Sequence, residues 1–198
     1  MHILLVVNPQ AGHKKARKIF PQIERKFAAY GITFDTLFTE YKGHGIKLVE
    51  LASLEKYDAL VSVGGDGTLF EVLNGYFLNR RTKIPPLGII PLGTGNAFIR
   101  DIGLVNFDWE KAIELIWQKR TKRVDVGLLK TDSSVYYFIN ILGVGFVADV
   151  GATADKLKVF GELSYIFGVF HQLRSRLGRE CEDLFCIVCL LRPLLVVE

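Results

Sequence analysis

Four short segments rich in apolar residues in the first half of the chain predict β-strands, and the first of them is a continuous apolar run that stops at Asn8-Pro9. These segments cover residues 3–7, 33–38, 59–63 and 86–90. Between them, apolar residues recur at three- and four-residue intervals, which is typical of one face of a helix. Helices are expected around residues 16–27, 43–54 and 68–76, with a further one capped by Asp108. Strands that alternate with helices in this way predict an α/β fold with a parallel sheet.

The pattern changes after Arg123, where strand-like runs follow one another directly. A polar turn at residues 131–134 separates two of these runs, and helical stretches are expected around 152–158 and 161–173. The end of the chain, from Asp183, is again strand-like. We therefore expect a boundary near residues 119–124, which divides the chain into an α/β domain (1–122) and a β-rich domain (123–198). Pro21 is expected to kink the first helix or to mark its start.

Charge and composition narrow the classes of function. The 198 residues include 25 Lys and Arg against 21 Asp and Glu, a net charge of +4. This mild excess suits anionic ligands or an anionic membrane surface, and it is no signature of nucleic-acid binding. The pair Cys186 and Cys189 is interpreted as buried strand residues rather than a metal site, and no disulfide framework is expected. The four histidines lack metal-ligand spacing. No apolar run approaches the ~20 residues that span a bilayer, so a cytoplasmic protein is expected.

Three loops follow three of the predicted strands, at residues 8–12, 64–67 and 91–95. In a parallel sheet such loops gather at the carboxyl ends of the strands, where ligands bind. The loop 64–67 opens a helix, and the unpaired N–H groups of a helix N-terminus attract phosphate. Its spacing matches neither of the common glycine-rich nucleotide motifs. Together the loops predict a phosphate site built from Gly64, Gly65, Gly67 and Thr68, from Gly93, Thr94, Gly95 and Asn96, and from Asn8, Pro9 and Gly12.

Asp66 is the unexpected residue in this site, because a carboxylate repels phosphate. It fits there if it holds Mg²⁺ or accepts a proton during phosphoryl transfer, and the alternative is an ordinary turn-forming aspartate. Thr68 and Glu71 also match a T-x-x-E capping box, which would explain both residues structurally. Asn74 is interpreted as a surface or helix-end residue.

Four motifs resemble the catalytic domain of diacylglycerol kinases, a family that includes sphingosine, ceramide and bacterial lipid kinases. They are NPQAG, TEYKGHG, GGDGTLFEVLNG and PLGTGNAFIRDIG, in this order over residues 8–103, and weaker similarity continues to about residue 172. The resemblance implies a two-domain kinase that uses ATP and Mg²⁺ and phosphorylates a lipid hydroxyl at a membrane surface. By position it implies a nucleotide site lined by Asn8, Pro9, Ala11, Gly12, Thr39, the segment 65–71 with Glu71, and Thr94. It gives Asp66 a catalytic role, in proton transfer or in binding Mg²⁺ through water.

The sequence departs from this family in three places. Ala97 stands where an acid is common, and Phe70 stands where asparagine is frequent. The acidic DGE-like motif that supplies the family's catalytic base has no match, so the resemblance implies an incomplete second domain. Two alternatives therefore stay open: a non-catalytic remnant that binds nucleotide or lipid, and an NAD kinase, which also uses a GGDG loop. Basic and aromatic residues around 156–179 form either a peripheral membrane contact or a solvated helix face, and the apolar end could pair with another chain in a homodimer.

Overall fold

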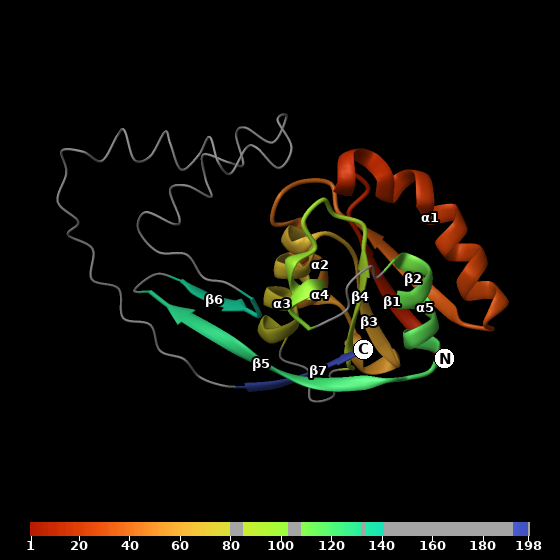
Figure 1. Cartoon of the computed structure of the whole chain (residues 1–198). Helices are drawn as coiled ribbons and strands as arrows, with labels where there is room; N and C mark the ends of the chain where they lie inside the picture. Colours follow the sequence, from red (N-terminus) through yellow and green to blue (C-terminus); the bar gives the residue numbers. More distant parts are fainter. Residues whose placement is uncertain (80–84, 103–107, 132–133, 141–191, 198) are drawn as a thin grey trace. The chain divides into compact units, whose positions relative to one another are not determined.

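The computed structural model of the chain describes residues 1–79, 85–102, 108–131, 134–140 and 192–197 (Figure 1). Strands and helices alternate along its first part, as the sequence predicts. The strands are β1 (His2–Val7), β2 (Thr33–Phe38), β3 (Ala59–Gly64), β4 (Leu87–Pro91), β5 (Thr121–Lys130), β6 (Val135–Phe138) and β7 (Arg192–Val197). The helices are α1 (Ala11–Ala29), α2 (His44–Leu51), the 3₁₀ turn η1 (Leu54–Lys56), α3 (Asp66–Leu78), α4 (Ala97–Asp101) and α5 (Trp109–Trp117).

The described strands form one sheet in the order β2-β1-β3-β4-β7-β5-β6. The first four are parallel to their neighbours, with Val6 opposite Leu37 on one side and opposite Ser62 on the other. β7 pairs parallel with β4 and antiparallel with β5, and β5 continues into an antiparallel hairpin with β6. The predicted α/β fold with a parallel sheet is confirmed.

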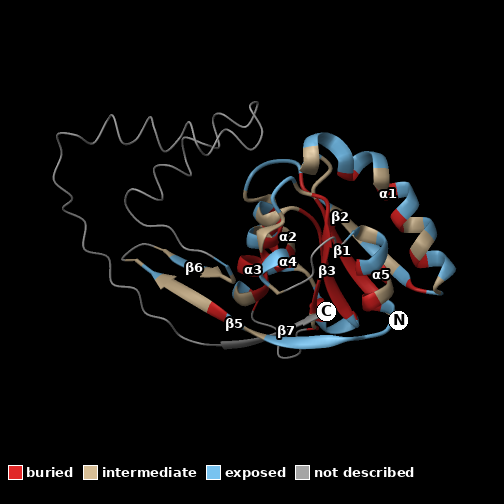
Figure 2. Ribbon diagram, in the orientation of Figure 1, coloured by how far each residue is buried: buried red, intermediate tan, exposed pale blue. Residues whose placement is uncertain are grey.

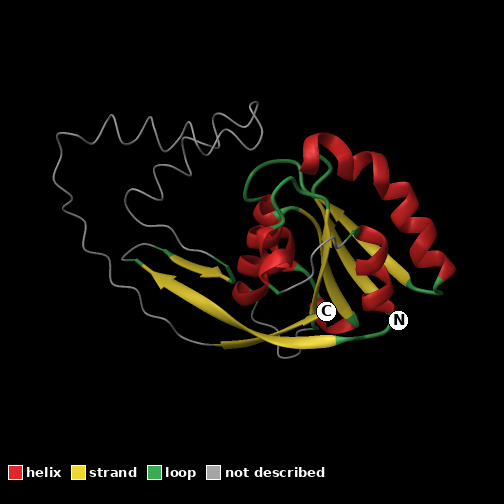
Figure 3. Ribbon diagram, viewed as in Figure 1, coloured by secondary structure: helices red, strands yellow, loops and turns green. Residues whose placement is uncertain are grey.

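Helices cover both faces of the parallel sheet, and each face has its own core (Figures 2 and 3). Leu4 and Val6 pack on one face with side chains of α2 and α3. Ile3, Leu5 and Val7 alternate to the other face and pack with α1 and α5. This explains why the inner strands are continuous apolar runs, since both sides of each strand are buried.

The start of α1 differs from the prediction. The helix begins at Ala11 and runs through Pro21, so the proline does not mark its start. The interruption lies instead at Gly12, His13 and Lys14, which all have positive φ angles of 58°, 56° and 70°. Glycine adopts this left-handed conformation without steric cost, whereas the next two residues do so at a cost. The predicted cap of α5 is confirmed, because the Lys111 N–H donates to Asp108 Oδ1 (2.8 Å).

The β5–β6 hairpin closes through the predicted polar turn, where the Thr131 N–H donates to the Ser134 carbonyl (2.8 Å). β5 crosses the expected domain boundary, and all described residues belong to one compact unit. The helices expected at 152–158 and 161–173 and the cysteines lie outside the described residues.

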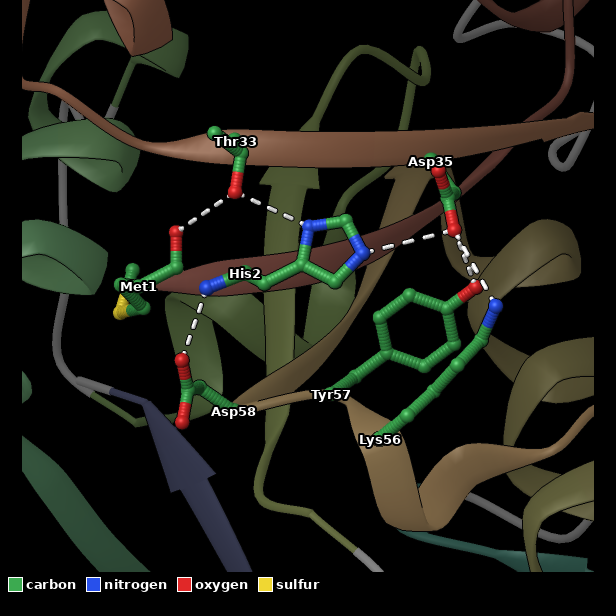
Figure 4. A network of polar contacts seen from close by, with 7 residues as sticks. All are labelled: Met1, His2, Thr33, Asp35, Lys56, Tyr57 and Asp58. Carbon is green, nitrogen blue, oxygen red and sulfur yellow. Dashed lines mark hydrogen bonds and ion pairs between the residues drawn. The ribbon is translucent and has the colours of Figure 1, made fainter.

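A polar network joins the amino ends of the first three strands (Figure 4). The His2 N–H donates to Asp58 Oδ2 (2.7 Å), and the Tyr57 hydroxyl donates to Asp35 Oδ2 (2.6 Å). Lys56 and His2 each approach the same Asp35 oxygen at 3.4 Å. The Tyr57 hydrogen bond, supported by Lys56, lowers the pKa of the Asp35 carboxyl. Because ligands of parallel sheets bind at the opposite, carboxyl edge, this network is structural.

Candidate functional site

Backbone hydrogen bonds bring the three predicted loops together at the carboxyl ends of β1, β3 and β4. The first glycine loop (8–12), the second (64–67) and the third (91–95) follow these strands in that order. The Asn8 N–H donates to the Val63 carbonyl (3.0 Å), and the Leu92 and Gly93 N–H groups both donate to the Gly64 carbonyl (2.7 and 3.2 Å). The convergence expected from the sequence is therefore present.

Glycines allow these loops to touch backbone to backbone. A Cβ placed on Gly65 would lie 2.8 Å from the Gly93 Cα, and one on Gly93 would collide with the Gly65 Cα. A Cβ on Gly12 would collide with the Leu92 carbonyl oxygen, at a position that already has a left-handed backbone. By contrast, a Cβ on Gly67 would have nothing within 4 Å. Gly12, Gly65 and Gly93 are thus fixed by packing, whereas Gly67 leaves open space at the start of α3.

Asparagine side chains shape the first and third loops. Asn96, with a left-handed backbone, accepts from the Gly93 N–H through Oδ1 (3.0 Å) and donates from Nδ2 to the Gly93 carbonyl (2.9 Å). Asn8 Oδ1 accepts from the Gln10 N–H (3.0 Å), which closes the turn that Pro9 begins. Thr94 and Gly95 are exposed at the tip of the third loop, and Ala11 packs against the core on the α1 side. The exposed hydroxyl and N–H groups of this tip are the part that a ligand can reach.

Asp66 lies between the second and third loops. It is the first residue of α3, and its Oδ1 accepts from the Phe98 N–H at the start of α4 (3.3 Å). A Cβ on Gly95 would lie 3.0 Å from the second carboxylate oxygen, so that oxygen is close to the exposed tip of the third loop. A negative charge at a helix N-terminus is electrostatically favourable, which explains how the carboxylate is tolerated there.

The predicted capping box is wrong. α3 begins three residues earlier than a Thr68 cap requires, with Gly65 at the N-cap, and Thr68 is buried inside the first turn beside Gly64. Glu71 instead reaches across to α2. Its Oε1 accepts from the Gly43 N–H (2.7 Å) and its Oε2 accepts from the Gly45 N–H (2.9 Å).

Glu71 thereby fixes a fourth loop, residues 39–43, which follows β2. Thr39 at its start is 8% exposed, and its N–H donates to the Val7 carbonyl (2.9 Å). Thr39 and Glu71 therefore lie side by side, since a Cβ on Gly45 would contact both side chains. The structure brings together the residues that the resemblance placed around a nucleotide, but it gives Glu71 a supporting position.

The interpretation of Asn74 as a surface or helix-end residue is also wrong, because its side chain is 2% exposed. Its Nδ2 donates to the carbonyls of Phe70 and Tyr137 (2.8 and 2.9 Å), and its Oδ1 accepts from the Tyr137 N–H (2.9 Å). The Asn74 side chain thus bonds to both the N–H and the carbonyl of one β6 residue, as the backbone of a neighbouring strand would. Sequence analysis missed this contact, although an asparagine inside an apolar helix face is a signal that a buried partner exists.

Electrostatics favour an anion at this edge of the sheet. The N-terminus of α3 points into the loop cluster, and exposed cations follow the first glycine loop on α1, namely Lys14, Lys15, Arg17 and Lys18. Within the described residues, no three His, Cys, Asp or Glu side chains are grouped to hold a metal ion by themselves. Within this part of the chain, a divalent cation beside Asp66 would need further oxygen ligands from outside the described residues.

A separate groove of about 760 Å³ lies between β2 and α2, lined by residues such as Leu37, Leu48 and Tyr57. None of the three glycine loops contributes to its lining, so it is distinct from the loop cluster. In the part of the chain that the structure describes, no helix is long and apolar enough to cross a membrane.

Comparisons with known proteins agree with this geometry. The family model of the diacylglycerol kinase catalytic domain matches residues 2–129. A diacylglycerol kinase of Bacillus subtilis is 32% identical over 90% of this chain and 57% of its own length. Sphingosine kinase 1 of Arabidopsis thaliana is 31% identical over 84% of this chain and 36% of its own length.

A crystal structure of a diacylglycerol kinase from Bacillus anthracis superposes with a TM-score of 0.58 at 33% identity, over 70% of this chain and 48% of the other. The chain spans about half the length of its bacterial relatives and about a third of the plant enzyme. The matched region contains all three glycine loops, Asp66, Glu71 and Asn74. The chain therefore belongs to the diacylglycerol kinase catalytic-domain family.

Proposed function

We propose that this chain is the nucleotide-binding part of an ATP-dependent lipid kinase, which transfers the γ-phosphoryl group of ATP to a hydroxyl of a diacylglycerol- or sphingosine-like lipid. The observation that carries the proposal is the position of Asp66. Asp66 lies between the second and third of the converging glycine loops, and the Phe98 N–H donates to one of its carboxylate oxygens. The names of the relatives support the choice of a lipid hydroxyl as acceptor.

The loop cluster fits a triphosphate. Its glycines exclude side chains where the loops approach each other, and the N-terminus of α3 offers N–H groups at the open position of Gly67. The exposed Thr94 and Gly95 can complete the phosphate contacts. Asp66 is the described carboxylate placed to hold Mg²⁺, directly or through water, and Mg²⁺ supplies charge neutralisation of the phosphates when it is bound.

In the proposed reaction, the lipid hydroxyl oxygen forms a bond to the γ-phosphorus while the bond between that phosphorus and the bridging β–γ oxygen breaks. ADP leaves, and the hydroxyl proton passes to a base and then to solvent. The loops orient the phosphates. Asp66 would either receive this proton or hold Mg²⁺ beside the phosphates, and both roles need its negative charge.

The test is transfer of labelled phosphate from ATP to diacylglycerol and to sphingosine, comparing the wild type with Asp66→Asn. We expect a loss of at least about a hundredfold in the variant, because removing a catalytic acid–base group typically costs 10²–10⁴-fold. Glu50→Gln, which changes an exposed carboxylate on α2, is the control and should keep the wild-type rate. Full activity of Asp66→Asn would refute the role of Asp66.

A thermal-shift measurement with ATP and Mg²⁺ distinguishes the alternatives. Stabilisation without any phosphorylated lipid would identify a non-catalytic nucleotide-binding protein. Formation of NADP from NAD and ATP would identify an NAD kinase instead.

A further inference from the structure

Two exposed aromatic side chains stand beside the loop cluster. Phe70 on α3 is 39% exposed and Tyr136 on β6 is 41% exposed. Their rings stack with centroids 6.4 Å apart and an interplanar angle of 26°. We call this pair the aromatic wall. Together the two rings form an exposed apolar surface one helical turn from Asp66, and apolar surfaces beside a polar site are a feature of ligand-binding grooves.

The wall lies one helical turn from Asp66. Residues four apart on a helix share a face, so Phe70 follows Asp66 along α3 by about 6 Å. A ligand whose reactive group lies at Asp66 can therefore place its neighbouring atoms on the Phe70 ring. The polar loops contact the other side of Asp66, through Phe98 and Gly95.

Buried contacts hold the wall in place. Asn74, one turn further along α3, pairs with both the N–H and the carbonyl of Tyr137 at 2.9 Å. The Phe77 and Tyr137 rings stack at 4.5 Å. Because Tyr137 is fixed in this way, the adjacent Tyr136 is presented to Phe70 without ordering a flexible segment, and binding there costs little conformational entropy.

We propose that the aromatic wall contacts the apolar part of the acceptor, next to the hydroxyl that receives the phosphoryl group. The inference rests on the proposed function and adds a specificity-determining surface to it. A triphosphate gains no binding free energy from an apolar surface, whereas the first methylene groups of a lipid acceptor are stabilised when such a surface removes them from water.

The experiment compares Phe70→Asn and Tyr136→Ser with the wild type in two assays on the full chain. The first is binding of NBD-labelled diacylglycerol and NBD-labelled sphingosine by fluorescence anisotropy, which needs no turnover. The second is nucleotide affinity, measured from the thermal shift with ATP and Mg²⁺. Trp117→Ala, an exposed aromatic residue on α5, is the control, and circular dichroism verifies that each variant is folded.

We expect both wall variants to bind the preferred lipid about five- to tenfold more weakly, while the nucleotide affinity stays within about twofold. Unchanged lipid binding, or an equal loss with Trp117→Ala, would overturn the inference. A loss of nucleotide affinity in Phe70→Asn would also overturn it, because the ring would then contact the nucleotide. The inference would also be refuted if the wild type bound neither lipid. A wild type that binds lipid without phosphorylating it contradicts the proposed function alone.

Discussion

Glu71→Gln tests whether the contact between α3 and α2 organises the nucleotide side of the site. The carboxylate accepts one N–H from Gly43 and one from Gly45, at 2.7 and 2.9 Å. Gln keeps the size of the side chain but replaces one acceptor oxygen by an NH₂ group, which would face a backbone donor. One charge-assisted hydrogen bond is lost, and one part-buried N–H is left without its acceptor.

The expected cost follows from these contacts. A hydrogen bond to a charged group contributes about 1.5–3 kcal/mol, and the carboxylate at the N-terminus of α2 adds about 0.3–1 kcal/mol. We therefore expect Glu71→Gln to lower the free energy of unfolding by about 2–3 kcal/mol. Urea denaturation followed by far-UV circular dichroism measures this change, and an unchanged m-value would show that the unfolding reaction is the same.

Glu50→Gln on α2 is the control, since Glu50 is exposed and its replacement should stay within about 0.5 kcal/mol of the wild type. If Glu71→Gln also stays within that range, the two hydrogen bonds do not stabilise the protein and the reasoning fails. A second readout is the thermal shift with ATP and Mg²⁺. The shift should be smaller in Glu71→Gln, because the loop 39–43, which begins with Thr39, would no longer be fixed to α3.

Three further predictions concern the loops and two titrating groups. Gly65→Ala and Gly93→Ala should lower the melting temperature by several degrees, because a Cβ at either position meets the backbone of the facing loop, whereas Gly67→Ala should not. Burial raises the pKa of Tyr76 to about 12, so Tyr76→Phe should remove one late-ionising tyrosine from an absorbance titration. The pKa of Asp35 is lowered in the folded state, so its stabilising effect is present above the ordinary pKa of 3.8 and is lost as the pH falls through the folded value. Acid unfolding monitored by circular dichroism should therefore be less steep below about pH 4 in Asp35→Asn than in the wild type.

The elements that sequence analysis predicted well are those with a strong local pattern. β1, β3 and β4 are buried on both faces, so each is a continuous apolar run that ends at a loop. If the strands are parallel, the three loops must gather at one edge of the sheet, so their convergence can be predicted without knowing any side-chain contact. The cluster around Asp66 was therefore predictable.

The errors arose where a residue's partner is distant in the sequence. Glu71 bonds residues 26 and 28 positions away, and Asn74 bonds a residue 63 positions away. The capping-box motif pairs Glu71 with the nearby Thr68, whereas the observed partners of Glu71 are the N–H groups of Gly43 and Gly45. The start of α3 was misplaced for a related reason, because the glycines of the second loop suggested a turn where Asp66 and Gly67 are already helical.

These distant contacts make α3 the element that connects both halves of the proposed reaction. Gly75 brings α3 against α2 so closely that a Cβ there would lie 2.5 Å from the Ile46 carbonyl oxygen, and Glu71 joins the same two helices one turn earlier. On another face, Asn74 binds β6 and thereby sets the position of Tyr136. Asp66 at the N-terminus of the same helix cannot move relative to either contact without breaking buried hydrogen bonds. The glycine loops and the aromatic wall are consequently held in fixed relative positions by a single helix, which is the preorganisation that the proposed transfer between two substrates would require.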